Sequence, residues 1–155
     1  MNFAGIYYYD GQGIVVPCKL GIRHVRQLDG AAICVQRGTA VESSLSAYFA
    51  ANGLNFRQVA IARADEARTA YLAGRCDALA ADFSALHAML ATIPSDDHVI
   101  LPETLSKSPL GPVVRHGDEA FANIVRWALH GMISAEEAGI TSDNIDRMWK
   151  GTDPA

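Results

Sequence analysis

The sequence has no basic run and no basic patch interleaved with aromatic side chains, and its formal net charge is −4. Proteins that bind nucleic acid need such a patch to meet the phosphates, so nucleic acid is not an expected partner. No stretch approaches the roughly 18 consecutive apolar residues of a membrane-spanning helix. The first residues, Met1 to Tyr7, have neither a basic n-region nor an apolar h-region, so no secretory signal peptide is expected in this chain.

Cysteine and histidine are few and scattered. The three cysteines, Cys18, Cys34 and Cys76, have no C-x-x-C spacing, and the five histidines form no H-E-x-x-H motif. We therefore expect no metal site, and nothing in the sequence calls for a cofactor. With 155 residues, 50% of them hydrophobic, the chain has enough apolar material for one domain of ordinary size with a sizeable core.

Apolar strands and amphipathic helices alternate along the middle of the chain. Strands are predicted at 32–36, 56–61, 76–81 and 99–101, and helices at 41–52, at 65–73 with Asp65 as its cap, and at 84–92. Residues 6–10 and 14–16 are β-prone and flank turn chemistry at 10–13, whereas a strand at 110–115 and helices at 118–134 and 143–150 follow. The alternation predicts an α/β fold with a parallel sheet wound by right-handed crossovers.

A Gly-Thr turn joins the first strand of this alternation to the first helix. Gly38 lets the backbone turn, and the first amides of the following helix have no partners within the helix. Those amides, the Thr39 hydroxyl and the positive end of the helix can together hold a carboxylate or a phosphate. The same residues also fit a plain helix cap, in which Thr39 needs no ligand.

A second polar position, Asp82, follows the apolar strand predicted at 76–81. In a doubly wound sheet, ligands bind outside the carboxyl ends of the strands, where the strand order reverses. We expect Gly38, Thr39 and Asp82 to meet at that edge. An anion cradle that faces a carboxylate suits a zwitterion, such as an amino acid held by both ends. The alternative is that Asp82 only caps the helix that starts near Ser84.

Six phrases in order carry a family resemblance over nearly the whole chain: YYDGQGIVV, LDGAAICVQRGTAVE, AYFAANGLNF, AGRCDALAADFSAL, DDHVILPETLSKSPLGPVVRHGD and IVRWALHGMISAEEAGIT. The sequence closely resembles general L-amino-acid-binding proteins of bacterial ABC uptake systems. The resemblance implies a type II periplasmic-binding-protein lobe, that is, a doubly wound, mostly parallel sheet with helices on both faces. It also implies an L-amino acid ligand, an ABC permease partner and a periplasmic location. The chain is about half as long as a two-lobe binding protein and matches the C-terminal lobe.

The resemblance also implies a division of the chain. Residues 1–16 contain a first hinge strand, 17–109 a complete α/β ligand-binding lobe, 110–117 a returning hinge strand, and 118–155 C-terminal helices that cover the other lobe in the family. The N-terminal lobe of the family supplies an arginine and an apolar lid to the ligand, and this chain does not contain them. Binding by this chain alone is therefore expected to be weak.

The resemblance assigns roles to residues of the two motifs. Thr39 would donate its hydroxyl, and Thr39 and Ala40 their backbone amides, to the ligand α-carboxylate, whereas Asp82 would accept from the α-ammonium. Gln36 is the candidate for side-chain selectivity, and Gly38 shapes the turn. The family often has hydroxyl residues where this chain has Ala40, Ala80 and Ala81, so the range of ligands stays open.

Two rival functions stay open beside the non-enzymatic receptor. A dehydratase-like enzyme on the same lobe would use Glu42 or Asp82 as its acid or base, although the sequence places no second acid-base partner. A non-binding relic, or an effector domain that acts by self-association, is the other rival. We also expect a homodimer through the C-terminal helices or the hinge strands, since Phe121, Ile124, Val125, Leu129 and Met132 would otherwise leave an apolar stripe in water.

Cys34 and Cys76 lie early on two predicted strands that should be neighbours in a 2-1-3 order. The periplasmic setting of the family allows a disulfide between them, provided that their Cα atoms lie within about 7 Å. Two free buried thiols are the alternative.

Overall fold

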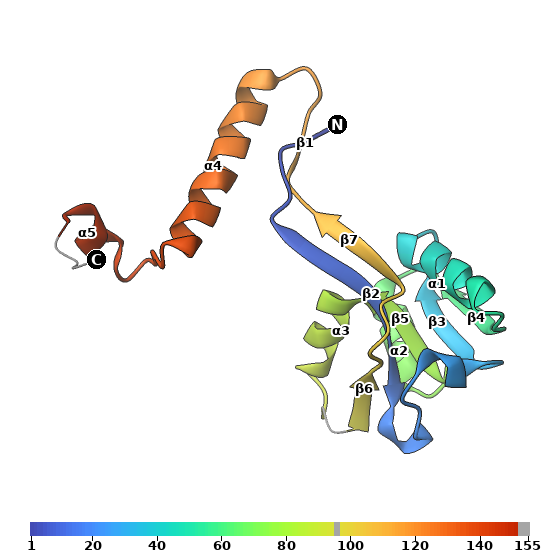
Figure 1. Ribbon diagram of the computed structural model, residues 1–155. Helices are drawn as coiled ribbons and strands as arrows, with labels where there is room; N and C mark the ends of the chain where they lie inside the picture. The colour runs from blue at the N-terminus through green and yellow to red at the C-terminus, as the bar shows by residue number, and fades with distance from the viewer. Residues whose placement is uncertain (95–96, 152–155) are drawn as a thin grey trace. The chain divides into compact units, whose positions relative to one another are not determined.

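A computed structural model describes residues 1–94 and 97–151 (Figure 1). The chain falls into two compact units. One is Asp10–Ser108, and the other combines Met1–Tyr9 with the chain from Pro109 onward. The expected ranges of the hinge strands and the lobe stay a prediction. Within the described residues, no helix has the length and apolar character needed to cross a membrane.

The first unit, Asp10–Ser108, is built on one sheet in the order β4-β3-β5-β2-β6, with β7 paired to β2. The strands are β2 (Tyr8–Pro17), β3 (Ala32–Gln36), β4 (Arg57–Ile61), β5 (Ala78–Asp82), β6 (His98–Ile100) and β7 (Ser106–Leu110). Strand β3 is parallel to β4 and β5, and β2 is antiparallel to β5 and β6. The three parallel strands therefore follow the expected 2-1-3 order.

Helices cover both faces of this sheet because side chains alternate along each strand. On one face, Ile14, Ile33, Val35 and Ala80 pack against α1 (Ala40–Ala51) through Leu45 and Phe49. On the other face, Val15, Cys34 and Leu79 pack against α2 (Ala64–Leu72) and α3 (Phe83–Leu90) through Ala67, Tyr71, Leu86 and Met89. Two short 3-10 helices, η1 (Cys18–Leu20) and η2 (Val25–Leu28), precede β3. The expected doubly wound, mostly parallel α/β fold is confirmed.

The second unit pairs β1 (Asn2–Phe3) with β8 (Val113–Val114) in an antiparallel ladder. Helix α4 (Glu119–Glu137) follows and is capped as expected, because the Asp118 carboxylate accepts from the Phe121 amide at 3.0 Å. Helix α5 (Ile145–Trp149) comes last. Only Ala122 of α4 is buried, so most of this long helix lies in water.

The turn expected at residues 10–13 is wrong, because β2 runs through these residues without interruption. The reason is packing rather than turn chemistry. A Cβ built on Gly11 would lie 2.7 Å from the ring of Phe83, and one on Gly13 would lie 2.2 Å from it. The two glycines therefore make room for an aromatic ring that lies flat on the strand.

Two smaller expectations also fail. Arg63, not Asp65, is the N-cap of α2, and Asp65 lies in the first turn, where its carboxylate accepts from Arg63 Nε and Nη2 at 3.0 and 3.1 Å. The strand expected at 110–115 is divided, since β7 ends at Leu110 and β8 holds only Val113–Val114. Between them Gly111 comes so close to the Gly5 carbonyl that a Cβ would lie 1.8 Å from its oxygen.

The disulfide between Cys34 and Cys76 is present, with a Cα to Cα distance of 5.7 Å. It joins β3 to the segment that leads into β5, its parallel neighbour in the sheet. Cys18 is a free, half-buried thiol. The disulfide, rather than a pair of free thiols, therefore links the two strands that end at the candidate site.

Candidate ligand site at the carboxyl edge of the sheet

The turn after β3 is shaped by Gly38, whose φ of 74° lies in the left-handed region. Thr39 is the N-cap of α1: its hydroxyl donates to the Gln36 carbonyl at 2.8 Å and accepts from the Glu42 amide at 3.4 Å. Among the described residues, the backbone amides of Thr39 and Ala40 have no hydrogen-bond partner. Two donors at the positive end of a helix are therefore available to an anion.

A carboxylate of the chain itself already binds this turn. The Gly38 amide donates to Glu42 Oε2 at 2.6 Å, and Gln58 Nε2 donates to Glu42 Oε1 at 2.5 Å. Each oxygen of Glu42 thus has a partner within the scaffold. The contact shows that an amide of this turn can reach a carboxylate, and it does not use the amides of Thr39 and Ala40.

Asp82 ends β5 and occupies the N-cap position of α3, yet its side chain makes no capping hydrogen bond. The carboxylate of Asp10, in β2, caps α3 instead. It accepts from the Ser84 hydroxyl at 2.5 Å, from the Ser84 amide at 3.3 Å and from the Gly11 amide at 2.8 Å. The half-buried Asp82 carboxylate is therefore not committed to the helix, which removes the capping alternative for its side chain.

The two carboxylates have opposite pKa shifts. Burial and the nearby charge of Asp10 raise the pKa of Asp82, although a hydrogen bond from Gln12 opposes this. Burial also acts to raise the pKa of Asp10, but the hydrogen bonds from Ser84 and Gly11 outweigh it and hold that pKa below its usual range. Asp10 therefore stays ionised. A cation placed beside Asp82 would stabilise the ionised form of its carboxylate.

The shift at Asp10 predicts a pH-dependent contribution to stability. At neutral pH, Asp10→Asn should lower the free energy of unfolding by about 1 kcal/mol, because the ionised cap of α3 is lost. Since the folded-state pKa is lowered, this contribution is present above the unfolded pKa near 4 and is lost as the pH falls through the folded value. Urea unfolding of both proteins at pH 7 and at pH 3 measures it. A difference that stays constant between these pH values would contradict the prediction.

The turn and Asp82 leave the sheet at the same edge. Strands β3 and β5 are parallel neighbours, with Ile33 opposite Ala78 and Cys34 opposite Leu79. Continued along both strands, this register brings Gln36 level with Ala81. Gly38, Thr39, Ala40 and Asp82 therefore follow adjacent strand ends, which is where doubly wound sheets bind their ligands.

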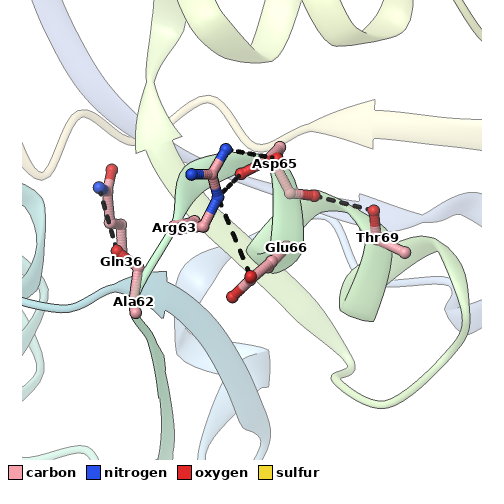
Figure 2. A network of polar contacts seen from close by, with 6 residues as sticks. All are labelled: Gln36, Ala62, Arg63, Asp65, Glu66 and Thr69. Atoms are coloured by element: carbon pink, nitrogen blue, oxygen red, sulfur yellow. Dashed lines mark hydrogen bonds and ion pairs between the residues drawn. The ribbon is translucent and has the colours of Figure 1, made fainter.

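Gln36 points to the other neighbour of β3. Figure 2 shows its side chain beside Ala62, at the end of β4, where Nε2 donates to the Ala62 carbonyl at 3.5 Å. The same view contains Arg63 with Asp65 and Glu66 at the start of α2. This contact places the Gln36 side chain on the β4 side of β3, whereas Asp82 lies on the β5 side.

Gln12 is a polar residue of this region that sequence analysis missed. It lies directly opposite Asp82 in the antiparallel pairing of β2 with β5, and it is 2% exposed. A lone glutamine between two glycines, just before the apolar run Ile14 to Val16, was the available signal. The turn assigned to these residues concealed it.

No family model matches the sequence. Curated relatives match nearly all of it. The glutamate/glutamine/aspartate/asparagine-binding protein BztA of Rhodobacter capsulatus is 45% identical over 153 residues, which are 98% of this chain and 45% of that protein. The putative amino-acid ABC transporter-binding protein YhdW of Escherichia coli K12 is 44% identical over 156 residues, 100% of this chain and 45% of that protein. The general L-amino acid-binding periplasmic protein AapJ of Rhizobium johnstonii is 45% identical, with 99% and 45% covered.

Solved structures agree with these relatives. A periplasmic binding protein of an ABC transporter from Brucella ovis, with glutathione bound, superposes with a TM-score of 0.91 at 45% identity, covering 99% of this chain and 49% of that one. A point mutant of arginine-bound ArgBP from T. maritima gives a TM-score of 0.69 at 27% identity, with 84% of this chain and 59% of that one covered. The expected type II periplasmic-binding-protein lobe is thereby confirmed, and the chain spans about half the length of the curated relatives it matches. Over the part that it spans, the chain is similar to amino-acid-binding proteins of ABC transporters, in agreement with the resemblance that its sequence phrases carry.

Proposed function

We propose that this chain binds the α-carboxylate and α-ammonium of an L-amino acid as part of an ABC uptake receptor. The observation that carries the proposal is the pairing of two amides, at Thr39 and Ala40, that have no partner among the described residues, with Asp82, a carboxylate that does not cap its helix, at one edge of the sheet. The Thr39 and Ala40 amides would hold the ligand carboxylate, and Asp82 would accept from its ammonium. Gly38 shapes the turn, and Gln36 would face the ligand side chain only after leaving Ala62.

Weak binding is the first expected result. Thr39 and Asp82 are only half-buried and Ala40 is exposed, so water competes for every contact. We expect a dissociation constant for L-glutamine of about 1 mM, equivalent to about 4 kcal/mol. Titration of the 15N-labelled chain should move the amide signals of Thr39 and Ala40. Affinity in the micromolar range, or shifts confined to other residues, would contradict the assignment.

Asp82→Asn tests the ammonium contact. The variant keeps the shape of the side chain and the cap of α3, since that cap comes from Asp10. It should weaken L-glutamine binding by about tenfold to a hundredfold, because a charge-assisted hydrogen bond is lost. Asp146→Asn, on the exposed side of α5, removes the same charge and should leave the affinity unchanged. Equal affinities for all three proteins would remove Asp82 from the site.

We further propose that the chain is a receptor without catalytic turnover. The curated relatives are named as binding proteins. Glu42 is one of the two acid-base candidates of the rival enzyme, and its two oxygens accept from the Gly38 amide and from Gln58 Nε2. One-dimensional NMR of L-glutamine or prephenate incubated with the chain should show no product. Product formation that Glu42→Gln abolishes would revive the enzyme.

The proposed setting is the periplasm, with an ABC permease as the partner that receives the ligand. AapJ is named as a periplasmic protein, and a disulfide such as that between Cys34 and Cys76 persists in oxidising compartments. Fractionation of cells that carry the natural gene, with an antibody against this chain, tests the location.

We also propose self-association through the second unit. Helix α4 exposes large apolar side chains, with Ile124 65%, Trp127 74% and Met132 72% exposed. Beside them lies a groove of about 840 Å³, whose lining includes Tyr7, Pro112, Leu129 and Ile140. Light scattering at tens of micromolar protein should give a dimer, and Ile124→Asp should give a folded monomer. A wild-type monomer under these conditions would reject self-association.

A further inference from the structure

Gln12 is a buried polar side chain with one atom unaccounted for. The residue is 2% exposed, and its Nε2 donates to the Ser108 hydroxyl at 3.4 Å. Its carbonyl oxygen, Oε1, is buried and has no hydrogen-bond partner among the described residues. A buried acceptor without a donor is costly, so such an atom in a native protein calls for a donor from outside the chain, such as a water, an ion or a ligand.

The sheet directs Gln12 toward the candidate site. Gln12 and Asp82 are paired across β2 and β5, and paired residues project from the same face of a sheet. Residues Ile14 and Val16, two and four positions further along β2, pack on the face covered by α1. Gln12 therefore shares that face with Asp82, and α1 begins at the Thr39 turn.

Phe83 packs beside Gln12 and Asp82 on the opposite face of the sheet. Its ring lies over Gly11 and Gly13, the neighbours of Gln12 on both sides. Because Phe83 follows Asp82 directly in the chain, the contact holds the end of β5 in place across Gln12. Asp82 and Gln12 are thus positioned by a packed aromatic ring rather than by mobile loops.

The side-chain amide of Gln12 has one donor atom and one acceptor atom, and this decides which of them is left for a ligand. An ionised carboxylate only accepts hydrogen bonds, so Gln12 presents its Nε2 to Asp82, and this bond acts to lower the pKa of Asp82. Oε1, which can only accept, has no partner among the described residues, and the carboxylate of Asp82 opposite Gln12 cannot supply a donor when it is ionised. The pair therefore requires a ligand group with several donors, and an ammonium has three.

We propose that Gln12 Oε1 is a second acceptor for the ligand α-ammonium, which it shares with the Asp82 carboxylate. This inference rests on the proposed function and adds Gln12 to its ligand contacts. The role explains why a glutamine is buried in β2 opposite Asp82.

The test compares two ligands on the full chain. L-Glutamine carries the ammonium, whereas glutaramate is the same molecule without it. Gln12→Met keeps the length of the side chain and removes both polar atoms. It should weaken L-glutamine binding about tenfold and leave glutaramate binding unchanged, as read from the shifts of Thr39 and Ala40. In the free protein, the Asp82 carboxyl should titrate at a higher pH in this variant, because its hydrogen bond from Gln12 is lost.

Gln12→Glu covers the case in which Gln12→Met does not fold. It restores two acceptor oxygens at the same position, so at pH 8 it should bind L-glutamine at least as tightly as the natural chain. Wild-type affinity in Gln12→Met, or equal losses for both ligands, would overturn the role of Gln12. Weakened binding of L-glutamine by Gln12→Glu at pH 8 would overturn it too. No shift of Thr39 and Ala40 with L-glutamine in the natural chain would instead overturn the proposed function, and this inference with it.

Discussion

Reducing the Cys34–Cys76 disulfide is expected to lower the free energy of unfolding by about 4 kcal/mol, the loop-closure value for a sequence separation of 42 residues. The bond restricts the unfolded chain, whose entropy rises when the two strands are released from each other. Urea unfolding with and without a phosphine reductant, followed by circular dichroism, measures the change.

A matched pair of variants separates the bond from other effects of reduction. Cys34→Ala with Cys76→Ala should reproduce most of the loss without reductant, because both side chains are buried and small. Cys18→Ala removes the free thiol instead and should respond to reductant as the natural chain does. A loss below about 1 kcal/mol on reduction would show that the closed loop is already restricted in the unfolded state.

Gly13→Ala is expected to destabilise the first unit by roughly 1–3 kcal/mol, the usual cost of overpacking. The added Cβ would lie 2.2 Å from Cε1 of Phe83, so the ring must move or β2 must shift. Either movement also disturbs Asp82, the residue before Phe83. Thermal unfolding and the amide shifts of residues 82–84 report the two consequences.

Gly131→Ala is the control for this substitution. Gly131 lies within α4 and a Cβ there meets no atom of the described residues within 4 Å, so alanine should stabilise the helix by about 0.5–1 kcal/mol. Phe83→Leu combined with Gly13→Ala should recover part of the loss, because the smaller side chain frees the space. Gly13→Ala with natural stability and unchanged shifts would mean that Phe83 can leave the strand without cost.

The parallel part of the sheet could be predicted from the sequence because its signals are local. Strand β3 was expected at 32–36 and is found at Ala32–Gln36, and helix α1 differs from its expected range by one residue at each end. Glycines flanked by polar residues indicate a turn by local rules, and only the ring of Phe83 makes Gly11 and Gly13 part of a strand. That contact joins residues about 70 positions apart, so no local pattern reveals it.

In the candidate site, too, local patterns predicted some residues, whereas others depend on contacts between distant parts of the chain. Thr39 and Asp82 lie at ends of adjacent strands, as the βα alternation predicts. The roles of Asp10 and Gln12 depend on the register of β2 against β5, which places Gln12 opposite Asp82. An antiparallel strand inserted beside parallel ones leaves no periodic trace in the sequence, so neither residue could be assigned.

The cap that Asp10 provides for α3 has a consequence for how the proposed receptor could change its ligand. Because the amide and hydroxyl of Ser84 donate to Asp10 of β2, the side chain at position 82 has no capping role at the helix start. Substitutions at position 82 can therefore change the charge of the site without destabilising α3. Both evolution and biosensor design could vary this residue. Asp82→Ser, for example, should retain the melting temperature of the natural chain and remove the contact that we propose for the ligand ammonium.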